Sequence, residues 1–171
     1  MLHHLIFFLI FLSIGILGGI VFLKNSHNRT HQSFVLLIVI LEIWIIAHYW
    51  QDEAIFKKYA PFLLKLDFAS GIFLCVSFYL FSRFFSQSIK FSIFEKFLIF
   101  IFVPLFSFLS FTNFVICNIH FRNDTIDGDP GILFLGYFLL ASFFVINGIR
   151  TLFIKYKQST GIEKCKCFMY Y

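Results

Sequence analysis

One acidic side chain, Glu42, lies in the middle of an apolar run at residues 34–50, and it is the first candidate for chemistry in this sequence. A charge at the centre of a bilayer costs roughly 2.5–3.5 kcal/mol on the insertion scale, so an acid at that depth must face protein or water. Such a group can bind a ligand, carry a proton or form a hydrogen bond between helices. Glu42 is therefore the centre of a candidate intramembrane polar site.

Serine hydroxyls are the partners that the sequence offers to Glu42. Each of the four other apolar runs has a serine near its centre, and these are Ser13, Ser77, Ser107 and Ser142. A protonated Glu42 that hydrogen-bonds to such hydroxyls would hold helices together, with a contribution of roughly 0.6–2 kcal/mol. No second ionisable group lies at that depth, so we expect this packing role, with a ligand or proton site as the alternative.

Other reactive residues lack the partners that catalysis or metal binding would need. The sequence shows no nucleophile beside a base, no paired carboxylates, no His-Glu-x-x-His helix and no phosphate-binding glycine loop. Cys165 and Cys167 supply only half of a tetrahedral metal site, and His48 fits an aromatic belt at a membrane interface. We therefore expect a protein that is not an enzyme and that holds no cofactor and no metal.

Five apolar runs have to position these side chains. The chain is 60% hydrophobic and only 13% charged, whereas a soluble domain carries about 25% charged residues. A helix of about 20 residues crosses the hydrocarbon core, and runs of this kind occupy residues 5–23, 34–50, 68–85, 97–116 and 132–149. The sequence therefore predicts an all-α fold, a polytopic transmembrane helix bundle that forms a single integral-membrane domain over residues 1–171.

Two features within the runs predict how the helices pack and bend. Gly15 and Gly19 form a Gly-xxx-Gly pair, a spacing that lets two helices approach closely. Pro104, in the fourth run, has no backbone N–H to donate, so it predicts a kink. Both features point to packing rather than to chemistry.

The basic residues predict how the bundle is oriented. With the N-terminus outside, ten of the 14 Lys and Arg residues fall on the cytoplasmic side and four on the outer side, as the positive-inside rule requires. The cytoplasmic ten are Lys24, Arg29, Arg83, Lys90, Lys96, Arg150, Lys155, Lys157, Lys164 and Lys166. The sequence therefore predicts the N-terminus out, the C-terminus in, and a location in the cell (inner or cytoplasmic) membrane. Because these charges orient the helices, we expect no nucleic-acid partner.

Two loops on the predicted outer side differ in character. Residues 54–66 mix apolar and basic side chains, which predicts an amphipathic stretch that lies in the outer interface. Residues 123–131 are rich in Asn, Asp, Gly and Pro, which predicts a solvated turn. A calcium-binding loop would need a regular spacing of ligands and a terminal Glu, so calcium binding is the weaker alternative for this loop.

Three segments occur in an order that a known family shares. Asn-Ser-His-Asn-Arg at residues 25–29 precedes the second run, and Leu-Asp-Phe-Ala at residues 66–69 begins the third. Leu-Phe-Ile-Lys-Tyr-Lys at residues 152–157 follows the fifth run, with Gly161 and Tyr170 after it. In these segments the chain resembles the N-terminal seven-transmembrane region of bacterial histidine kinases, in which the last segment is a basic turn between helices five and six.

The resemblance implies a membrane-embedded sensory or input module for signal transduction. Its partners would be the lipid bilayer and either a cytoplasmic signalling protein or a second copy of the chain. The sequence ends at Tyr171, where the family begins a sixth helix, and it shows no phosphoacceptor or ATP-binding domain. We therefore expect a truncated kinase or a module that a separate protein completes. The alternative is a small multi-pass structural or transport subunit that uses Glu42.

Overall fold

The computed structural model describes residues 2–53, 56–85, 91–122 and 125–167. Five helical spans are long and apolar enough to cross a membrane, and they are His4–Lys24, Arg29–Trp50, Ala60–Phe85, Ile93–Ser110 and Phe134–Gln158. The bundle of five spanning helices that the apolar runs predict is therefore confirmed, and the chain is a multi-pass membrane protein.

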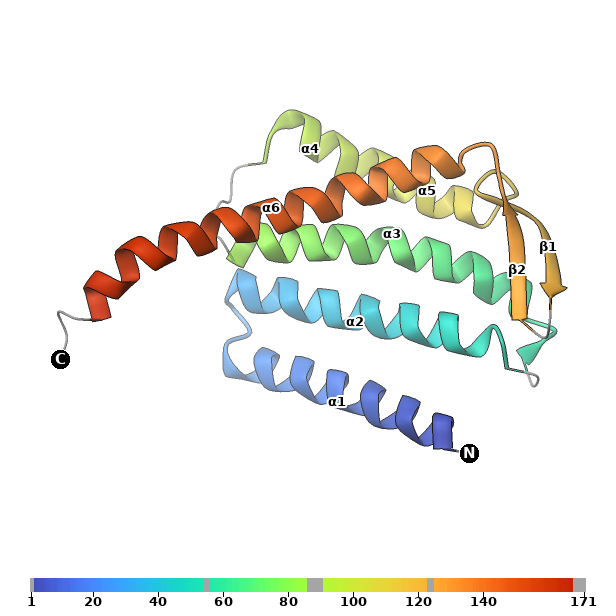
Figure 1. Ribbon diagram of the computed structural model, residues 1–171, viewed down its shortest axis with the longest axis horizontal. Coiled ribbons are helices and arrows are strands. Elements are labelled where there is room, and N and C mark those ends of the chain that lie inside the picture. The colour runs from blue at the N-terminus through green and yellow to red at the C-terminus, as the bar shows by residue number, and fades with distance from the viewer. Residues whose placement is uncertain (1, 54–55, 86–90, 123–124, 168–171) are drawn as a thin grey trace.

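The elements follow one another as labelled in Figure 1. Three long helices come first, a span built of two short α-helices around a π-helix comes next, and a β-hairpin then leads into a last long helix. Their bounds are α1 Leu2–Lys24, α2 Arg29–Trp50, α3 Ala60–Phe85, α4 Ile93–Phe97, η2 Leu98–Phe102, α5 Val103–Ser110, β1 Ile116–Arg122, β2 Thr125–Pro130 and α6 Phe134–Cys167. We call the end of the bundle with the N-terminus and the hairpin the hairpin end, and the other the opposite end (Figure 1).

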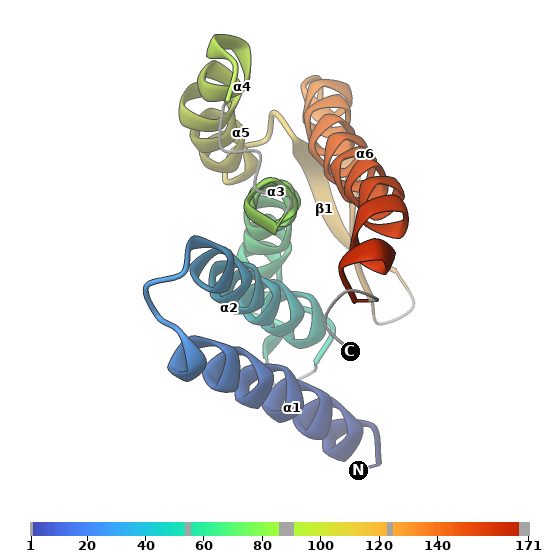
Figure 2. The ribbon, with the colours of Figure 1, turned by 90° about the vertical axis from the view of Figure 1, so that its left-hand side faces the viewer.

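α3 is the central helix of the bundle. It packs against α2, α5 and α6, while α1 packs on α2, so that α1, α2 and α3 form a row (Figures 1 and 2). Ser70, Ser77 and Ser82 of α3 are at most 5% exposed, and each donates its hydroxyl to a carbonyl four residues earlier. Because these small side chains satisfy their hydroxyls within α3, neighbouring helices can pack closely against it.

The fourth span contains a π-helical turn in front of Pro104. The turn comprises Leu98–Phe102, and the N–H of Val103 donates to the carbonyl of Leu98, five residues earlier. In a regular α-helix the Pro104 ring would collide with the carbonyl four residues before it, and the wider turn gives it room. The irregularity predicted at Pro104 thus takes the form of a π-helix.

A β-hairpin, which the sequence analysis did not predict, follows the fourth span. β1 pairs antiparallel with β2, and Ile116 lies opposite Pro130. The predictions of a helix up to residue 116 and of a solvated turn at residues 123–131 are therefore wrong for the described residues, and α5 ends at Ser110. The strands turn alternate side chains onto the bundle, which leaves Ile116 and Ile126 only 4% and 8% exposed.

Two further boundaries differ from the predictions. The stretch at residues 54–66 overlaps α3, which begins at Ala60 and buries Leu63 and Leu64, so its second half belongs to a spanning helix. The basic segment at residues 152–157, expected as a turn, lies within the continuous helix α6, and it contains no Pro or Gly to interrupt a helix. Residues 54–55 and 123–124 and Tyr170, which enter the sequence predictions, lie outside the described residues.

Candidate functional site

The carboxyl group of Glu42 lies between α1 and α2. Glu42 is half-buried, and a Cβ atom built on Gly15 of α1 would come within 2.7 Å of its Oε1 atom. The carboxyl therefore rests against the backbone of α1, at a place that glycine leaves open. Within the part of the chain that the structure describes, this carboxyl has no hydrogen-bond or ion-pair partner.

Two of the serines predicted to lie at the depth of Glu42 form hydrogen bonds within their own helices. The Oγ atom of Ser13 donates to the carbonyl of Leu9 at 2.6 Å, and that of Ser77 donates to the carbonyl of Phe73 at 2.7 Å. A hydroxyl has a single proton to donate, so neither serine donates to Glu42.

The other two serines lie on helices that pack against α3. Ser107 of α5 is 9% exposed and lines an apolar pocket of about 250 Å³, to which Ile40 and Ile43 of α2 contribute but Glu42 does not. Ser142 is half-buried on α6. The structure does not gather these serines around Glu42, because the face of α2 that carries Glu42 turns toward α1. The packing role of Glu42 stays a prediction.

Gly18, rather than Gly19, is the second glycine at the contact between α1 and α2. A Cβ atom on Gly18 would come within 2.9 Å of the Cγ2 atom of Ile38, whereas one on Gly19 would meet nothing within 4 Å. We expect Gly18→Ala to destabilise the protein by about 1–3 kcal/mol, because the β-branched Ile38 has little rotamer freedom to move away. Gly19→Ala is the matched control, expected to be neutral or slightly stabilising, since alanine is the better helix former. Thermal unfolding in detergent micelles measures both variants, and equal stabilities would contradict this packing.

A polar cluster at the hairpin end brings together residues that the sequence analysis left apart. His48 lies near the end of α2, Gln51 caps that helix, and Asp67 lies on α3. The Nδ1 atom of His48 is 3.4 Å from Oδ2 of Asp67 and 3.2 Å from Nε2 of Gln51. The Trp44 ring stacks on the His48 ring with centroids 5.4 Å apart, one helical turn deeper in the membrane. The cluster therefore joins the ends of two neighbouring helices.

A cavity of about 380 Å³ lies beside this cluster, against the hairpin. Its walls come from the ends of α2, α3 and α6 and from both strands, and the lining residues are His48, Gln51, Leu64, Asp67, Phe68, Ile116, Asp127, Gly128, Pro130 and Phe134. The hairpin is held beside α2 because the Oδ1 atom of Asp52 accepts the N–H of Ile126 at 3.0 Å. The cavity is thus mostly apolar, with a few polar groups from α2, α3 and β2, as is usual for small-molecule sites.

Two buried oxygen atoms of this cluster have no hydrogen-bond partner within the part of the chain that the structure describes. They are Oε1 of Gln51 and Oδ1 of Asp67, whose side chains are only slightly exposed: Gln51 is 5% exposed and the side chain of Asp67 is 13% exposed. A buried acceptor without a donor costs about 1–3 kcal/mol. A molecule that brings N–H or O–H donors into the cavity would remove this cost, so the arrangement favours binding of such a molecule.

The sequence contained part of the signal for this cluster. His48 and Gln51 are three residues apart, and residues at that spacing share one side of a helix. Asp67 follows in the next span, and it meets His48 only because α2 and α3 pack as neighbours with their ends level. The sequence therefore showed that His48 and Gln51 share one side of a helix, but it did not show that α2 and α3 are neighbours.

Neither a metal centre nor a known relative identifies the site. Among the described residues, no three His, Cys, Asp or Glu side chains lie close enough together to hold a metal ion. No family model, no curated protein and no solved structure matches the chain. The resemblance to the membrane region of histidine kinases therefore stays a prediction, and the candidate site rests on the geometry of the cavity at the hairpin end.

Proposed function

We propose that the chain is a membrane-embedded input module, which binds a small donor-bearing molecule at the hairpin end and transmits that event through the bundle. The observation that carries the proposal is the cavity against the hairpin, with the unpartnered oxygen atoms of Gln51 and Asp67 at its wall. A ligand that donates hydrogen bonds to both oxygens would draw the ends of α2 and α3 and the hairpin into one arrangement. This is the sensory role that the resemblance implies.

One continuous stretch of the chain connects the cavity to the opposite end of the bundle. β2 ends at Pro130 and α6 begins at Phe134, so the chain passes from the cavity wall into the last helix within a few residues. The junction is fixed to the segment between α5 and β1, where the N–H of Gly131 donates to the carbonyl of Val115 and that of Leu133 donates to the carbonyl of Phe114, both at 2.8 Å. α6 then runs along the bundle and projects beyond the other helices (Figure 1).

This path supports transmission by α6 to a signalling protein or to a second copy of the chain. A shift of the hairpin would displace the start of α6, and a stiff helix carries that displacement to its far end. Transmission requires two arrangements of the bundle that differ in affinity for the ligand. The alternative, a structural or transport subunit that uses Glu42, is supported by one observation, the unpartnered carboxyl between α1 and α2.

The test measures whether a change in the cavity moves the far end of α6. Spin labels are placed at Ile154→Cys on α6 and Asn25→Cys in the α1–α2 turn, in a background without the native cysteines, and their distance is measured by pulsed electron paramagnetic resonance in nanodiscs. Asp67→Asn removes the charge that faces His48 and adds N–H donors to the cavity, as a ligand would. We expect it to shift the distance by about 1–2 Å or more, the scale of helix shifts in switching proteins.

Two control variants distinguish an effect of the cavity from the effect of a charge elsewhere in the protein. Lys58→Gln changes an exposed charge at the hairpin end that does not line the cavity, and it should leave the distance unchanged. Glu42→Gln should also leave it unchanged if the cavity is the input site. An unchanged distance in Asp67→Asn contradicts the proposal, and a change in Glu42→Gln alone favours the alternative subunit.

A further inference from the structure

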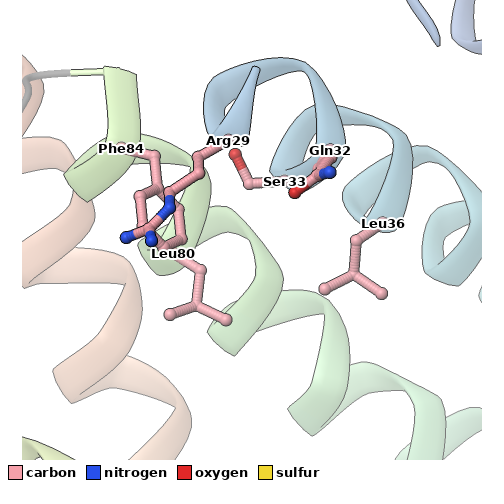
Figure 3. A pocket seen from close by; sticks show the side chains of 6 residues that line it. All are labelled: Arg29, Gln32, Ser33, Leu36, Leu80 and Phe84. Atoms are coloured by element: carbon pink, nitrogen blue, oxygen red, sulfur yellow. The ribbon is translucent and has the colours of Figure 1, made fainter. Parts of the chain in front are cut away.

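A second cavity, at the opposite end of the bundle, has a different character. It is a groove of about 300 Å³ between α2 and α3, lined by Arg29, Gln32, Ser33, Leu36, Leu80 and Phe84 (Figure 3). The proposed input function does not use this groove, which lies at the far end of α2 from the cavity at the hairpin end.

The end of the groove nearest the membrane surface is polar and positively charged. Arg29, in the first turn of α2, is exposed and extends toward α3 (Figure 3). It has no ion-pair partner among the described residues. Gln32 and Ser33 follow it on the same helix, and their side chains donate to the carbonyls of Ser26 and Thr30. The guanidinium group of Arg29 is therefore available to an anion, and it matches the geometry of a phosphate group.

The deeper part of the groove is apolar. Leu36 of α2 and Leu80 and Phe84 of α3 line it, and Leu36 is 44% exposed although it lies within a spanning helix. In a multi-pass membrane protein, an exposed surface of this kind faces lipid. The groove is therefore amphipathic along the membrane normal, with a cation at the headgroup level and apolar walls at the level of the acyl chains.

The charges around the groove favour an anionic occupant. Apart from Glu95 and from Glu163, which lies near the C-terminal end of α6, the described acidic residues lie at the hairpin end or, in the case of Glu42, at mid-span. Glu95 is already engaged by Arg83 at 3.5 Å and by the hydroxyl of Tyr79 at 2.5 Å. Basic pockets between transmembrane helices commonly bind the phosphate-bearing headgroups of anionic lipids.

We propose that the groove between α2 and α3 binds one anionic phospholipid, whose phosphate pairs with Arg29 and whose acyl chain lies on Leu36, Leu80 and Phe84. A soluble anion would use only the polar end of the groove, and a zwitterionic lipid would gain less from the unpaired guanidinium group. The bound lipid would fix the start of α2 against the end of α3.

The test compares lipids that differ only in headgroup. The full chain is purified in detergent and titrated with phosphatidylglycerol or phosphatidylcholine of the same acyl chains, and bound lipid is counted by native mass spectrometry. We expect the wild type to prefer phosphatidylglycerol. Arg29→Gln should weaken phosphatidylglycerol binding about fivefold, the equivalent of about 1 kcal/mol for one basic residue, and should leave phosphatidylcholine binding unchanged.

Three further arms separate a built lipid site from general attraction of anions. Lys24→Gln removes a nearby charge that does not line the groove, and it should retain the preference. Leu36→Trp fills the apolar part while keeping Arg29, and it should also weaken phosphatidylglycerol binding. This variant provides the test if circular dichroism shows that Arg29→Gln does not fold. Glycerol phosphate, which carries the phosphate without acyl chains, should not displace bound lipid.

Several results would overturn the proposal. Wild-type phosphatidylglycerol binding in folded Arg29→Gln or in Leu36→Trp would show that the groove does not hold the lipid. An equal loss in Lys24→Gln would show attraction by the whole basic surface. Displacement by glycerol phosphate would show a site for a soluble anion instead.

Discussion

Replacing Gly131 by alanine should force the junction between β2 and α6 away from the segment that precedes β1, and it should produce one of the largest losses of stability in this protein. A Cβ atom at this position would lie 2.3 Å from the carbonyl oxygen of Phe114, 2.6 Å from its carbonyl carbon and 2.9 Å from the carbonyl oxygen of Asn113. All three atoms belong to the backbone, so no side-chain rotation can relieve the clash. The backbone at Gly131 and the backbone at residues 113–115 must instead move apart, and this movement breaks the hydrogen bond from the N–H of Gly131 to the carbonyl of Val115. We expect a cost at or above the upper end of the about 1–3 kcal/mol typical of overpacking.

Gly136→Ala is the matched control for this substitution. Gly136 lies in the first turn of α6, and a Cβ atom built on it would lie nearest to the Cζ atom of the Phe106 ring, at 3.1 Å, the far end of a side chain that can shift. Chemical unfolding in detergent measures both variants, and limited proteolysis reports whether the hairpin has come loose. If Gly131→Ala were as stable as Gly136→Ala, the close packing of the junction against the segment between α5 and β1 would be refuted.

The five spans could be predicted because the signal for a membrane helix is local. About 20 apolar residues in a row are sufficient to cross the hydrocarbon core, whatever their neighbours do. The hairpin could not be predicted in the same way. Val115 and Ile116 extend the apolar run that precedes them, and the acidic turn formers beyond them suggest a loop. The strands depend instead on contacts with distant residues, such as the bond from Ile126 to Asp52.

The candidate sites show the same division between local and distant information. Position in a span gives the depth of a side chain, and depth alone suggested that Glu42 meets serines of the other helices. The direction in which a side chain points depends on which helices are neighbours, and here α1 is the neighbour that Glu42 faces. The contact between His48 and Asp67 is also a product of helix pairing. Depth was readable from the sequence, and direction around the helix axis was not.

Glu95 is the residue that joins α4 to α3 at the opposite end, and its loss should be the second large effect. Its Oε1 atom accepts the hydroxyl of Tyr79 at 2.5 Å, and its Oε2 atom accepts the N–H of Ser92 at 2.6 Å and lies 3.5 Å from Arg83. The Arg83 guanidinium also lies over the rings of Tyr79 and Phe91, at 5.8 and 5.3 Å from their centroids. One carboxylate thus caps a helix, holds a buried phenol and balances a cation.

Glu95→Leu would remove all three interactions and leave the Arg83 cation without this partner. Breaking a buried ion pair costs about 3–5 kcal/mol, and we expect the lower end of that range, because the side chains of Arg83 and Glu95 retain 19% and 18% of their exposure. Glu95→Gln should cost less, since the single amide oxygen can still accept the N–H of Ser92 while the NH2 group donates to the Tyr79 hydroxyl. The decisive measurement is a double-mutant cycle with Arg83→Met in detergent unfolding. If the pair is coupled, the double variant is more stable than the sum of the two single losses, because each single substitution already removes the same ion pair. Strict additivity would mean that the ion pair contributes nothing, and that Glu95 acts only through Tyr79 and the helix cap.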